Sequence, residues 1–404
     1  MKHYKQWSAA FASYFTFMGV WVAFGPSALM AVSPGAAPLA LAVLTLAYFV
    51  ATPLTRMVWN AWGFARTLVL TGAGVACSLG LAALLPQWLA WCVPLAFFFG
   101  SGSMMLCETR LIDYLAERKR GHDFVRARKW GSVGFLAAAS LSGAVFSVGG
   151  VNRSFTWLLA VCGLLYLASC LALAAVHDDA PGTHAKTPAP SANRAAEPAA
   201  EPAAAPDSPA SYTSTSRRER WTGCAAINAM RLGEIISTTW FGAYWLATGH
   251  SPLETGLLCA LPVAAEFVAM WKGTAFLARY SAASMMLLCA LVSVLRWLGT
   301  PYCSQLWCAI PLQSLHAYSF GFFYPASLLW LRQEFGAGFF RARYATESAL
   351  RAVTAAVMFA AAGGVIQAYG YSAVYGAGSG LALLSGLWWW RLVRRQQAAK
   401  QTAE

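Results

Sequence analysis

Runs of about twenty apolar residues recur along the whole chain and are separated by short polar connectors. A helix of that length matches the thickness of a bilayer core, so the pattern predicts an all-α membrane protein. We place twelve transmembrane spans, with ends set to within a few residues, at 7–29, 36–55, 67–86, 90–113, 131–149, 155–176, 221–247, 254–276, 283–300, 306–330, 345–367 and 372–392.

One long stretch departs from this pattern. Residues 177–220 are rich in Ala, Pro, Ser and Thr and repeat the sequence Ala-Ala-Glu-Pro. Such a composition cannot build an apolar core. We therefore expect a disordered cytoplasmic linker there, between a six-helix bundle at 1–176 and a second at 221–404 that ends in a short cytoplasmic tail.

The two expected bundles share a small sequence feature. Arg-Ala-Arg occurs at 126–128, just before the fifth span, and again at 341–343, just before the eleventh. The match is short, but it falls at equivalent places in the two halves. Parallel halves of six spans, with the substrate site at their interface, are a transporter architecture.

Composition excludes a soluble domain. Of the 404 residues, 58% are hydrophobic and only 11% are charged, whereas a soluble chain carries about 25% charged residues. The net charge of +13 does not indicate nucleic-acid binding, because most Lys and Arg lie in the connectors that follow even-numbered spans. This bias predicts cytoplasmic termini and contacts with anionic lipid.

Enzyme chemistry has no signature in this sequence. The ten cysteines form no CxxC motif and no Cys/His cluster, and we expect them to be packing residues rather than metal ligands or disulfides. We find no nucleophile–base pairing and no phosphate-binding loop. We therefore expect no enzymatic activity, no cofactor and no metal, and we expect a monomer.

Three successive spans each carry one charged or titratable side chain near the middle: Glu266, Arg296 and His316. A charge at mid-bilayer depth costs on the order of 2.5–3.5 kcal/mol, so such groups normally face a polar cavity and one another. We expect these three side chains to converge and to form the proton-coupling machinery of a transporter.

The seventh span carries further candidates. Arg231 and Glu234 are three residues apart and either form a salt pair on their own helix or place Glu234 in a substrate cavity. Trp240 and Tyr244 either stack on a ring-bearing substrate or serve in packing.

Five short segments of the sequence, taken together, indicate a relationship to a known group of transporters. They are Tyr14-Phe-Thr-Phe-Met-Gly19, the stretch 122–135 with Arg-Ala-Arg-Lys-Trp-Gly-Ser at its centre, Pro262-Val-Ala-Ala-Glu266, Leu295-Arg-Trp297 and Gln313-Ser-Leu-His316. Together they resemble the lactose permease and phenylpropionate transporter branch of the major facilitator superfamily, with the closer likeness to the phenylpropionate group.

The resemblance implies a role for four residues. Arg128 would contact the substrate, and Glu266 would link the substrate to the proton. Arg296 would help the proton to leave, and His316 would partner the acid of the eighth span.

Three positions depart from the lactose permease. Ser319 stands where that protein has its proton-carrying carboxylate, Phe135 stands at the tryptophan that stacks on the sugar, and Arg110 stands at a substrate-binding carboxylate. A galactoside substrate is therefore not expected. Arg110 and Arg128 favour an anionic substrate, because the guanidinium fork fits a carboxylate.

These observations predict a proton-coupled transporter of the bacterial inner membrane. Its partners would be protons, the bilayer and a small organic anion, with an aromatic acid as the first candidate. Three alternatives stay open: a proton-driven exporter of a drug or siderophore, a nucleoside or sugar symporter, and a membrane sensor or scaffold that transports nothing.

Overall fold

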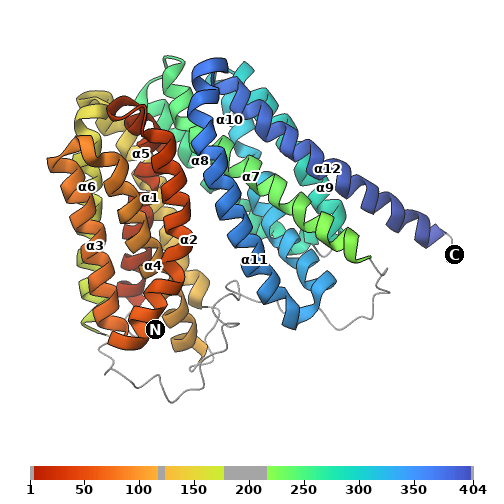
Figure 1. Ribbon diagram of the computed structural model, residues 1–404, viewed down its shortest axis with the longest axis horizontal. Coiled ribbons are helices and arrows are strands. Elements are labelled where there is room, and N and C mark those ends of the chain that lie inside the picture. Colours follow the sequence, from red (N-terminus) through yellow and green to blue (C-terminus); the bar gives the residue numbers. More distant parts are fainter. Residues whose placement is uncertain (1–3, 117–122, 177–215, 278, 402–404) are drawn as a thin grey trace. The chain divides into compact units, whose positions relative to one another are not determined.

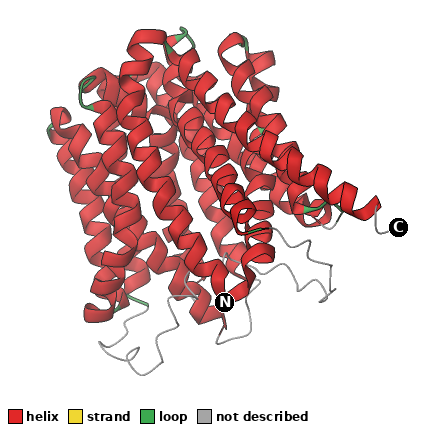
Figure 2. Ribbon diagram, turned by 45° about the vertical axis from the view of Figure 1, so that its right-hand side comes forward, coloured by secondary structure: helices red, strands yellow, loops and turns green. Residues whose placement is uncertain are grey.

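The computed structural model describes residues 4–116, 123–176, 216–277 and 279–401. Within these ranges Figure 2 shows helices joined by short loops, and no strand. The predicted all-α class with twelve helices is confirmed. In chain order (Figure 1) the helices are α1 (Tyr4–Val32), α2 (Ala37–Trp62), α3 (Phe64–Leu84), α4 (Leu89–Ala116), α5 (Asp123–Gly149), α6 (Val151–Ala174), α7 (Arg217–Ala247), α8 (Pro252–Leu277), α9 (Ala282–Gly299), α10 (Leu306–Ser314), α11 (Phe323–Tyr369) and α12 (Tyr371–Gln401).

The chain divides into two compact units. Unit 1 comprises Met1–Glu201, Phe241–Ala260 and Ala356–Gly363, and unit 2 comprises Pro202–Trp240, Leu261–Ala355 and Gly364–Glu404. Residues 177–215 of the predicted linker lie outside the described residues, and α7 begins at Arg217. The division into bundles at 1–176 and 221–404 stays a prediction.

Unit 1 is held together by packed aromatic rings and a few hydrogen bonds between helices. In this unit α1 packs mainly on α5, α3 on α6 and α2 on α4. The ring centroids of Phe17 and Phe97 are 5.0 Å apart, and the hydroxyls of Ser13 and Ser169 are 2.7 Å apart. In a bilayer the lipid is as apolar as the helix surface, so close packing and such hydrogen bonds hold helices together.

Unit 2 is organised around α9, which packs along α12 and contacts the segment that follows α10. Its buried tryptophans include Trp297 on α9, Trp330 on α11 and Trp389 on α12. The last two rings meet edge to face, with centroids 5.3 Å apart. This packing fixes the helix that carries Arg296.

Nine helical segments of the described chain are long and apolar enough to cross a membrane. The helices α7, α10 and α12 are not among them. The sequence of α7 contains six Arg and Glu residues, and α12 contains several Arg, Gly, Ser, Trp and Tyr residues; both sets lower the mean hydropathy, and α10 has only nine residues. Length and hydropathy alone therefore undercount the helices of unit 2.

The predicted tenth span at 306–330 is not one regular helix. It consists of α10, a π-helical segment η3 (Ala317–Phe322) and the beginning of α11. The helix α11 then continues past Gly336, whose φ of 68° lies in the left-handed region that glycine adopts without strain. The eleventh predicted span is the part of α11 beyond this bend.

A disulfide joins Cys303, in the connection from α9 to α10, to Cys308 in the first turn of α10. The expectation that all ten cysteines are unpaired packing residues is wrong for these two. Four residues separate the two cysteines in the sequence. The pattern of apolar spans could not reveal that these two cysteines are paired, because the pairing depends on how the turn between the helices folds. The other eight are free, and all of those except Cys77 are buried.

Candidate functional site

Four titratable side chains from four segments of unit 2 meet in one buried cluster. Glu234 comes from α7, Glu266 from α8 and Arg296 from the last turn of α9. His316 stands between α10 and η3, where the regular helix is interrupted. We call these four residues the charge cluster. Glu234, Arg296 and His316 expose only 4%, 3% and 7% of their surface.

Arg296 is the centre of the charge cluster. Its Nη1 lies 3.3 and 3.2 Å from the two carboxylate oxygens of Glu234, and 2.8 Å from Oγ of Ser319. Its Nη2 donates to Oε1 of Gln313 at 3.0 Å. Contacts on both arms fix the guanidinium plane, so Arg296 is a rigid cation beside Glu234.

Glu234 is equally well held. Thr238, one helical turn further along α7, donates its hydroxyl to Oε1 at 2.7 Å. The same oxygen lies 2.9 Å from Nδ1 of His316. A buried ion pair needs such additional hydrogen bonds to offset the loss of water, and removing one partner typically costs about 3–5 kcal/mol.

The contacts of His316 define which ring nitrogen carries a proton. Nδ1 lies 2.9 Å from Oε1 of Glu234 and 3.2 Å from Nη1 of Arg296. A guanidinium only donates and a carboxylate only accepts, so we assign Nδ1 as the donor to Glu234. The variable proton position is then Nε2, on the opposite side of the ring.

Nε2 of His316 faces the second carboxylate of the cluster. It lies 3.8 Å from Oε2 of Glu266, which is within ion-pair range but longer than a hydrogen bond. The side chain of Glu266 is 22% exposed, against 5% for that of Glu234. Of the two acids, Glu266 is therefore the one that solvent reaches.

A glycine allows the segment after His316 to approach α8 this closely. A methyl group at Gly321 would lie 3.0 Å from Cβ of Ala269 and 3.6 Å from Cα of Glu266. The π-helical segment contributes as well, because it contains Ser319 and follows directly on His316. π-helical turns are rare and often occur at functional sites.

Unit 1 contains a second charged group, built around Arg128 on α5. Its Nε donates to Oε1 of Glu108 on α4 at 3.0 Å, and its guanidinium lies 4.3 Å from the ring centroid of Phe15. The side chains of Arg128 and Glu108 are 33% and 38% exposed. We call Arg128 and Glu108 the exposed pair. Arg110 is half-buried two residues further along α4.

Trp240 and Tyr244, which were expected either to stack on substrate or to pack, are buried, and so is Phe135 at the position of the sugar-stacking tryptophan. Trp240 exposes 0%, Tyr244 6% and Phe135 7% of the surface. The ring of Trp240 lies 6.3 Å from that of Tyr371, and the ring of Tyr244 lies edge-on to Trp245. In this conformation these contacts are those of packing residues.

Some members of the site were not anticipated from the sequence. Thr238 lies four residues after Glu234, which is the spacing of one helix face. Ser319 was singled out only as a departure from the lactose permease, not as a partner of Arg296. Glu234 was expected either to pair with Arg231 or to line a cavity, but its carboxylate contacts Arg296 from α9. The guanidinium of Arg231 lies 4.5 Å from the ring centroid of Phe320.

Comparison with known families decides the class of protein. A model of the MFS_1 like family matches residues 9–376. The chain belongs to this family of the major facilitator superfamily. This MFS_1-like protein is thus a multi-pass membrane protein and a secondary transporter of a small-molecule substrate, not an enzyme. None of the curated protein sequences matches this chain.

Solved structures agree with the fold of this MFS_1-like protein. The nucleoside transporter NupG is 15% identical, with a TM-score of 0.76 over 97% of this chain and 99% of that one. An auto-inhibited peptide transporter of the POT family is 11% identical, with a TM-score of 0.67 over 98% and 97%. The human organic anion transporter MFSD10 (TETRAN) is 14% identical, with a TM-score of 0.57 over 96% and 98%. At these identities the likeness concerns the fold alone.

Proposed function

We propose that this transporter is a proton-coupled symporter of a small organic anion, with an aromatic acid as the first candidate. The proposal rests above all on the contact between His316 and Glu266 beside an ion pair that is already complete. Arg296 pairs with Glu234, whereas Glu266 is the more exposed acid of the cluster and faces Nε2 of His316, so a proton can pass between Glu266 and this ring nitrogen.

Glu266 carries the coupled proton and His316 shares it. With Nδ1 engaged by Glu234, Nε2 either accepts a proton from Glu266 or returns it. A shortening of the 3.8 Å separation by less than 1 Å, or one bridging water, completes the hydrogen bond. Arg296, whose Nη1 lies 3.2 Å from Nδ1 of the same ring, helps the proton to leave, which is the role that the resemblance implies for it.

Arg128 binds the carboxylate of the substrate, and Arg110 assists. The guanidinium of Arg128 is held by Glu108 and lies over Phe15, a combination of a cation and a ring that suits an aromatic acid. A substrate carboxylate competes with Glu108 for Arg128. Substrate binding therefore changes the charge balance in unit 1, as protonation does in unit 2.

The resemblance to the phenylpropionate transporters supports these roles, because it assigns substrate contact to Arg128 and proton coupling to Glu266, Arg296 and His316. We place the protein in the bacterial inner membrane with both termini in the cytoplasm. The Lys and Arg bias supports this orientation. The Cys303–Cys308 disulfide supports it independently, because disulfides persist on the oxidising side of such a membrane and this connector follows an odd-numbered span.

The decisive experiment uses purified protein in proteoliposomes. A thermal-shift screen with aromatic acids, nucleosides, sugars and siderophores first identifies a ligand. Uptake of that ligand is then measured with and without an imposed proton gradient for the parent protein and for Glu266→Gln. We expect Glu266→Gln to lose accumulation against a gradient and to retain exchange of substrate.

The matched control is Glu254→Gln, the same substitution on the same helix. Glu254 accepts from the backbone N–H of Ser251 at the start of α8 and lies outside the charge cluster. It should leave accumulation unchanged. If the Glu266→Gln protein still concentrates its substrate, Glu266 does not carry the proton. Extrusion instead of uptake in whole cells would favour the exporter alternative.

A further inference from the structure

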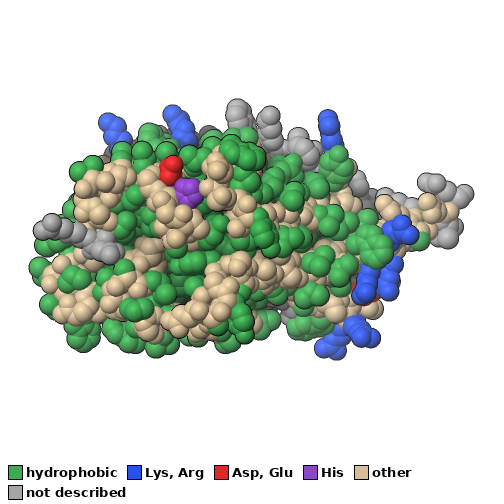
Figure 3. Space-filling view, turned by 90° about the horizontal axis from the view of Figure 1, so that it is seen from above, with side chains coloured by type: hydrophobic (Ala, Val, Ile, Leu, Met, Phe, Trp, Pro, Cys, Tyr) green, Lys and Arg blue, Asp and Glu red, His purple; other side chains and the backbone are tan. Residues whose placement is uncertain are grey.

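The cytoplasmic ends of α7 and α12 form a basic surface edged by tryptophan. Arg217 and Arg218 are exposed in the first turn of α7, and Arg391, Arg394 and Arg395 are exposed near the end of α12. Figure 3 shows Lys and Arg side chains gathered at the end of the view where the last turns of α12 lie. We call these five arginines the basic seam.

Two side-chain contacts hold the two helix ends together. Glu219 on α7 forms an ion pair with Arg395 on α12. The indole Nε1 of Trp388 donates to Oγ1 of Thr222 at 2.9 Å. Ser216 and Glu219 also cap α7 reciprocally, with Ser216 N–H donating to Glu219 at 2.8 Å. The basic seam is therefore built on a fixed frame.

The seam carries far more positive than negative charge. Glu219 is the only acid in the two helix ends from 216 to 222 and from 388 to 401. It is already engaged by Arg395, whose side chain remains 71% exposed. The neighbouring Arg220 does not belong to the seam, because it donates to the carbonyl oxygen of Glu334 at 3.3 Å.

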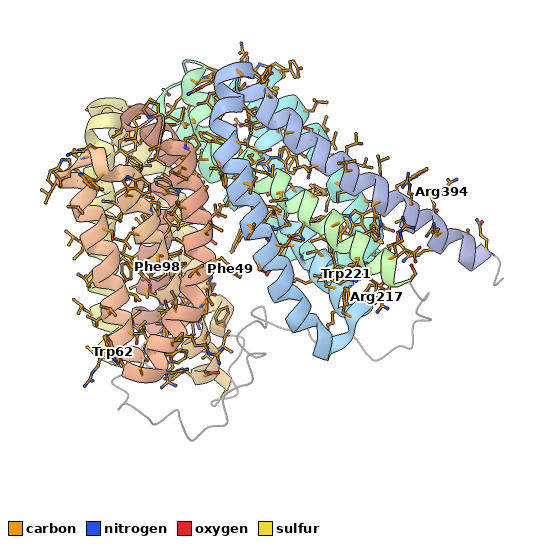
Figure 4. The ribbon with its side chains drawn as sticks, viewed as in Figure 1. Phe49, Trp62, Phe98, Arg217, Trp221 and Arg394 are labelled. Atoms are coloured by element: carbon orange, nitrogen blue, oxygen red, sulfur yellow. A yellow bond between two sulfur atoms is a disulfide. The ribbon has the colours of Figure 1, made fainter. Side chains whose placement is uncertain are left out.

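Exposed tryptophans indicate where the basic seam lies relative to the membrane surface. Trp221 and Trp390 are 50% and 49% exposed, and the guanidinium of Arg394 lies 5.8 Å from the ring centroid of Trp390. Figure 4 labels Arg217, Trp221 and Arg394 on these two helix ends. Indole rings concentrate at the level of lipid headgroups. A helix of 31 residues such as α12 spans about 46 Å, so its last turns extend beyond the hydrocarbon core.

We propose that the basic seam is a binding site for the phosphate headgroup of an anionic phospholipid. Arg391 and Arg394, one helical turn apart on α12, bind the phosphodiester, and Trp390 beneath Arg394 packs on the glycerol and upper acyl chain. Arg217, Arg218 and Arg395 add positive charge nearby, and Glu219 keeps the two helix ends at a fixed spacing. Arginine suits a phosphate because its planar donors match the phosphate oxygens. The site does not depend on which solute the protein transports.

Native mass spectrometry of the full-length protein in detergent tests the proposal. The protein is titrated with phosphatidylglycerol and, separately, with phosphatidylcholine. We expect the parent protein to retain phosphatidylglycerol preferentially. Each arginine near a charged lipid surface contributes about 1 kcal/mol, so Arg391→Gln/Arg394→Gln should weaken phosphatidylglycerol binding by about thirty-fold.

The matched control is Arg66→Gln/Lys129→Gln, which removes the same charge from exposed positions of unit 1. This variant should bind phosphatidylglycerol like the parent. Equal retention of the two lipids by the parent would overturn the proposal, and so would unchanged binding by the Arg391/Arg394 variant. Displacement of the bound lipid by millimolar inorganic phosphate would indicate a site for a soluble anion, and would also overturn it.

Discussion

The charge cluster of unit 2 and the exposed pair of unit 1 each contain an arginine paired with a glutamate, but the two pairs differ in burial and in the number of hydrogen bonds. In the charge cluster, Arg296 contacts Glu234, Ser319 and Gln313 and is 3% exposed. In the exposed pair, Arg128 forms an ion pair with Glu108, and about a third of its side chain is exposed. Each places an arginine beside a glutamate within helices of a membrane transporter.

The difference teaches which charges are fixed and which are exchangeable. A guanidinium with contacts on both arms cannot leave its partner without exposing a buried charge, so Arg296 belongs to the permanent frame of the site. A half-exposed pair is worth little by itself, about 0–1 kcal/mol, and a ligand carboxylate can replace its acid. The fixed pair suits proton handling, and the loose pair suits substrate binding.

The largest effect is expected from breaking the fixed pair. Arg296→Gln leaves Glu234 buried without its guanidinium and should destabilise the protein by about 3–5 kcal/mol. The double variant Glu234→Gln/Arg296→Gln removes both charges and should recover most of that loss. Thermal unfolding of the purified variants, followed by size-exclusion fluorescence, measures both. A double variant no more stable than Arg296→Gln would show that the pair is not a unit.

The disulfide beside the charge cluster should contribute less. Cys303 and Cys308 tie the end of α9, which carries Arg296, to the start of α10. Closing a loop of this size accounts for about 2 kcal/mol in the chain-entropy model. Cys303→Ser/Cys308→Ser should unfold at a lower temperature, and a membrane-impermeant reductant should lower the unfolding temperature of the parent only. If the reductant lowered the unfolding temperature of the double-serine variant as much as that of the parent, its effect could not be assigned to the Cys303–Cys308 disulfide.

The exposed pair should be dispensable for folding but not for transport. Arg128→Gln removes an ion pair that contributes about 0–1 kcal/mol, so the unfolding temperature should change little. The KM for the anionic substrate should rise at least tenfold, because one good charge-assisted contact is lost. Uptake kinetics and thermal unfolding on the same preparation check both statements. A large loss of stability with an unchanged KM would make Arg128 structural.

The smallest effect is expected at a third ion pair, Glu219 with Arg395. The backbone N–H of Ser216 and the nearby Arg395 hold the pKa of Glu219 below its ordinary value of 4.5. A depressed pKa stabilises the folded state above the ordinary value, and this contribution is lost as the pH falls below it. Because this ion pair lies at the surface, with the Arg395 side chain 71% exposed, only a few tenths of a kcal/mol are expected. In Glu219→Gln the unfolding temperature should fall slightly less than in the parent between pH 5 and pH 3. The same pH dependence in both proteins would show that Glu219 does not contribute to the loss of stability in acid.

The sequence predicted the helices better than their interruptions. Apolar runs set the number and approximate positions of the spans because a bilayer requires helices of that length. The π-helical segment after His316 left no such signal, since Ala-Tyr-Ser-Phe-Gly-Phe is compatible with a regular apolar helix. The disulfide depends on the conformation of the connection between α9 and α10, and the pattern of apolar residues gives no information about that conformation.

The candidate site divides in a similar way. Lone charges in apolar spans pointed to Glu266, Arg296 and His316, and these do lie together. Their coupling function stays a prediction. The partner of Glu234 depended on tertiary packing, because Arg231 on the same helix offered an equally good spacing. The burial of Trp240 and Tyr244 also follows from packing, since an apolar ring serves a core and a substrate equally well.

The π-helical segment Ala317–Phe322 has a consequence for alignment with other transporters. Such a segment holds one residue more than the α-helix it replaces, and one residue turns a helix by about 100°. Ser319 lies inside it, so counting three residues on from His316 does not reach the same direction in space as in a regularly wound relative. An equivalence drawn through this segment by residue count alone is therefore subject to an offset of one position, and only superposition of backbones can assign which side chain of a relative occupies the place beside Arg296.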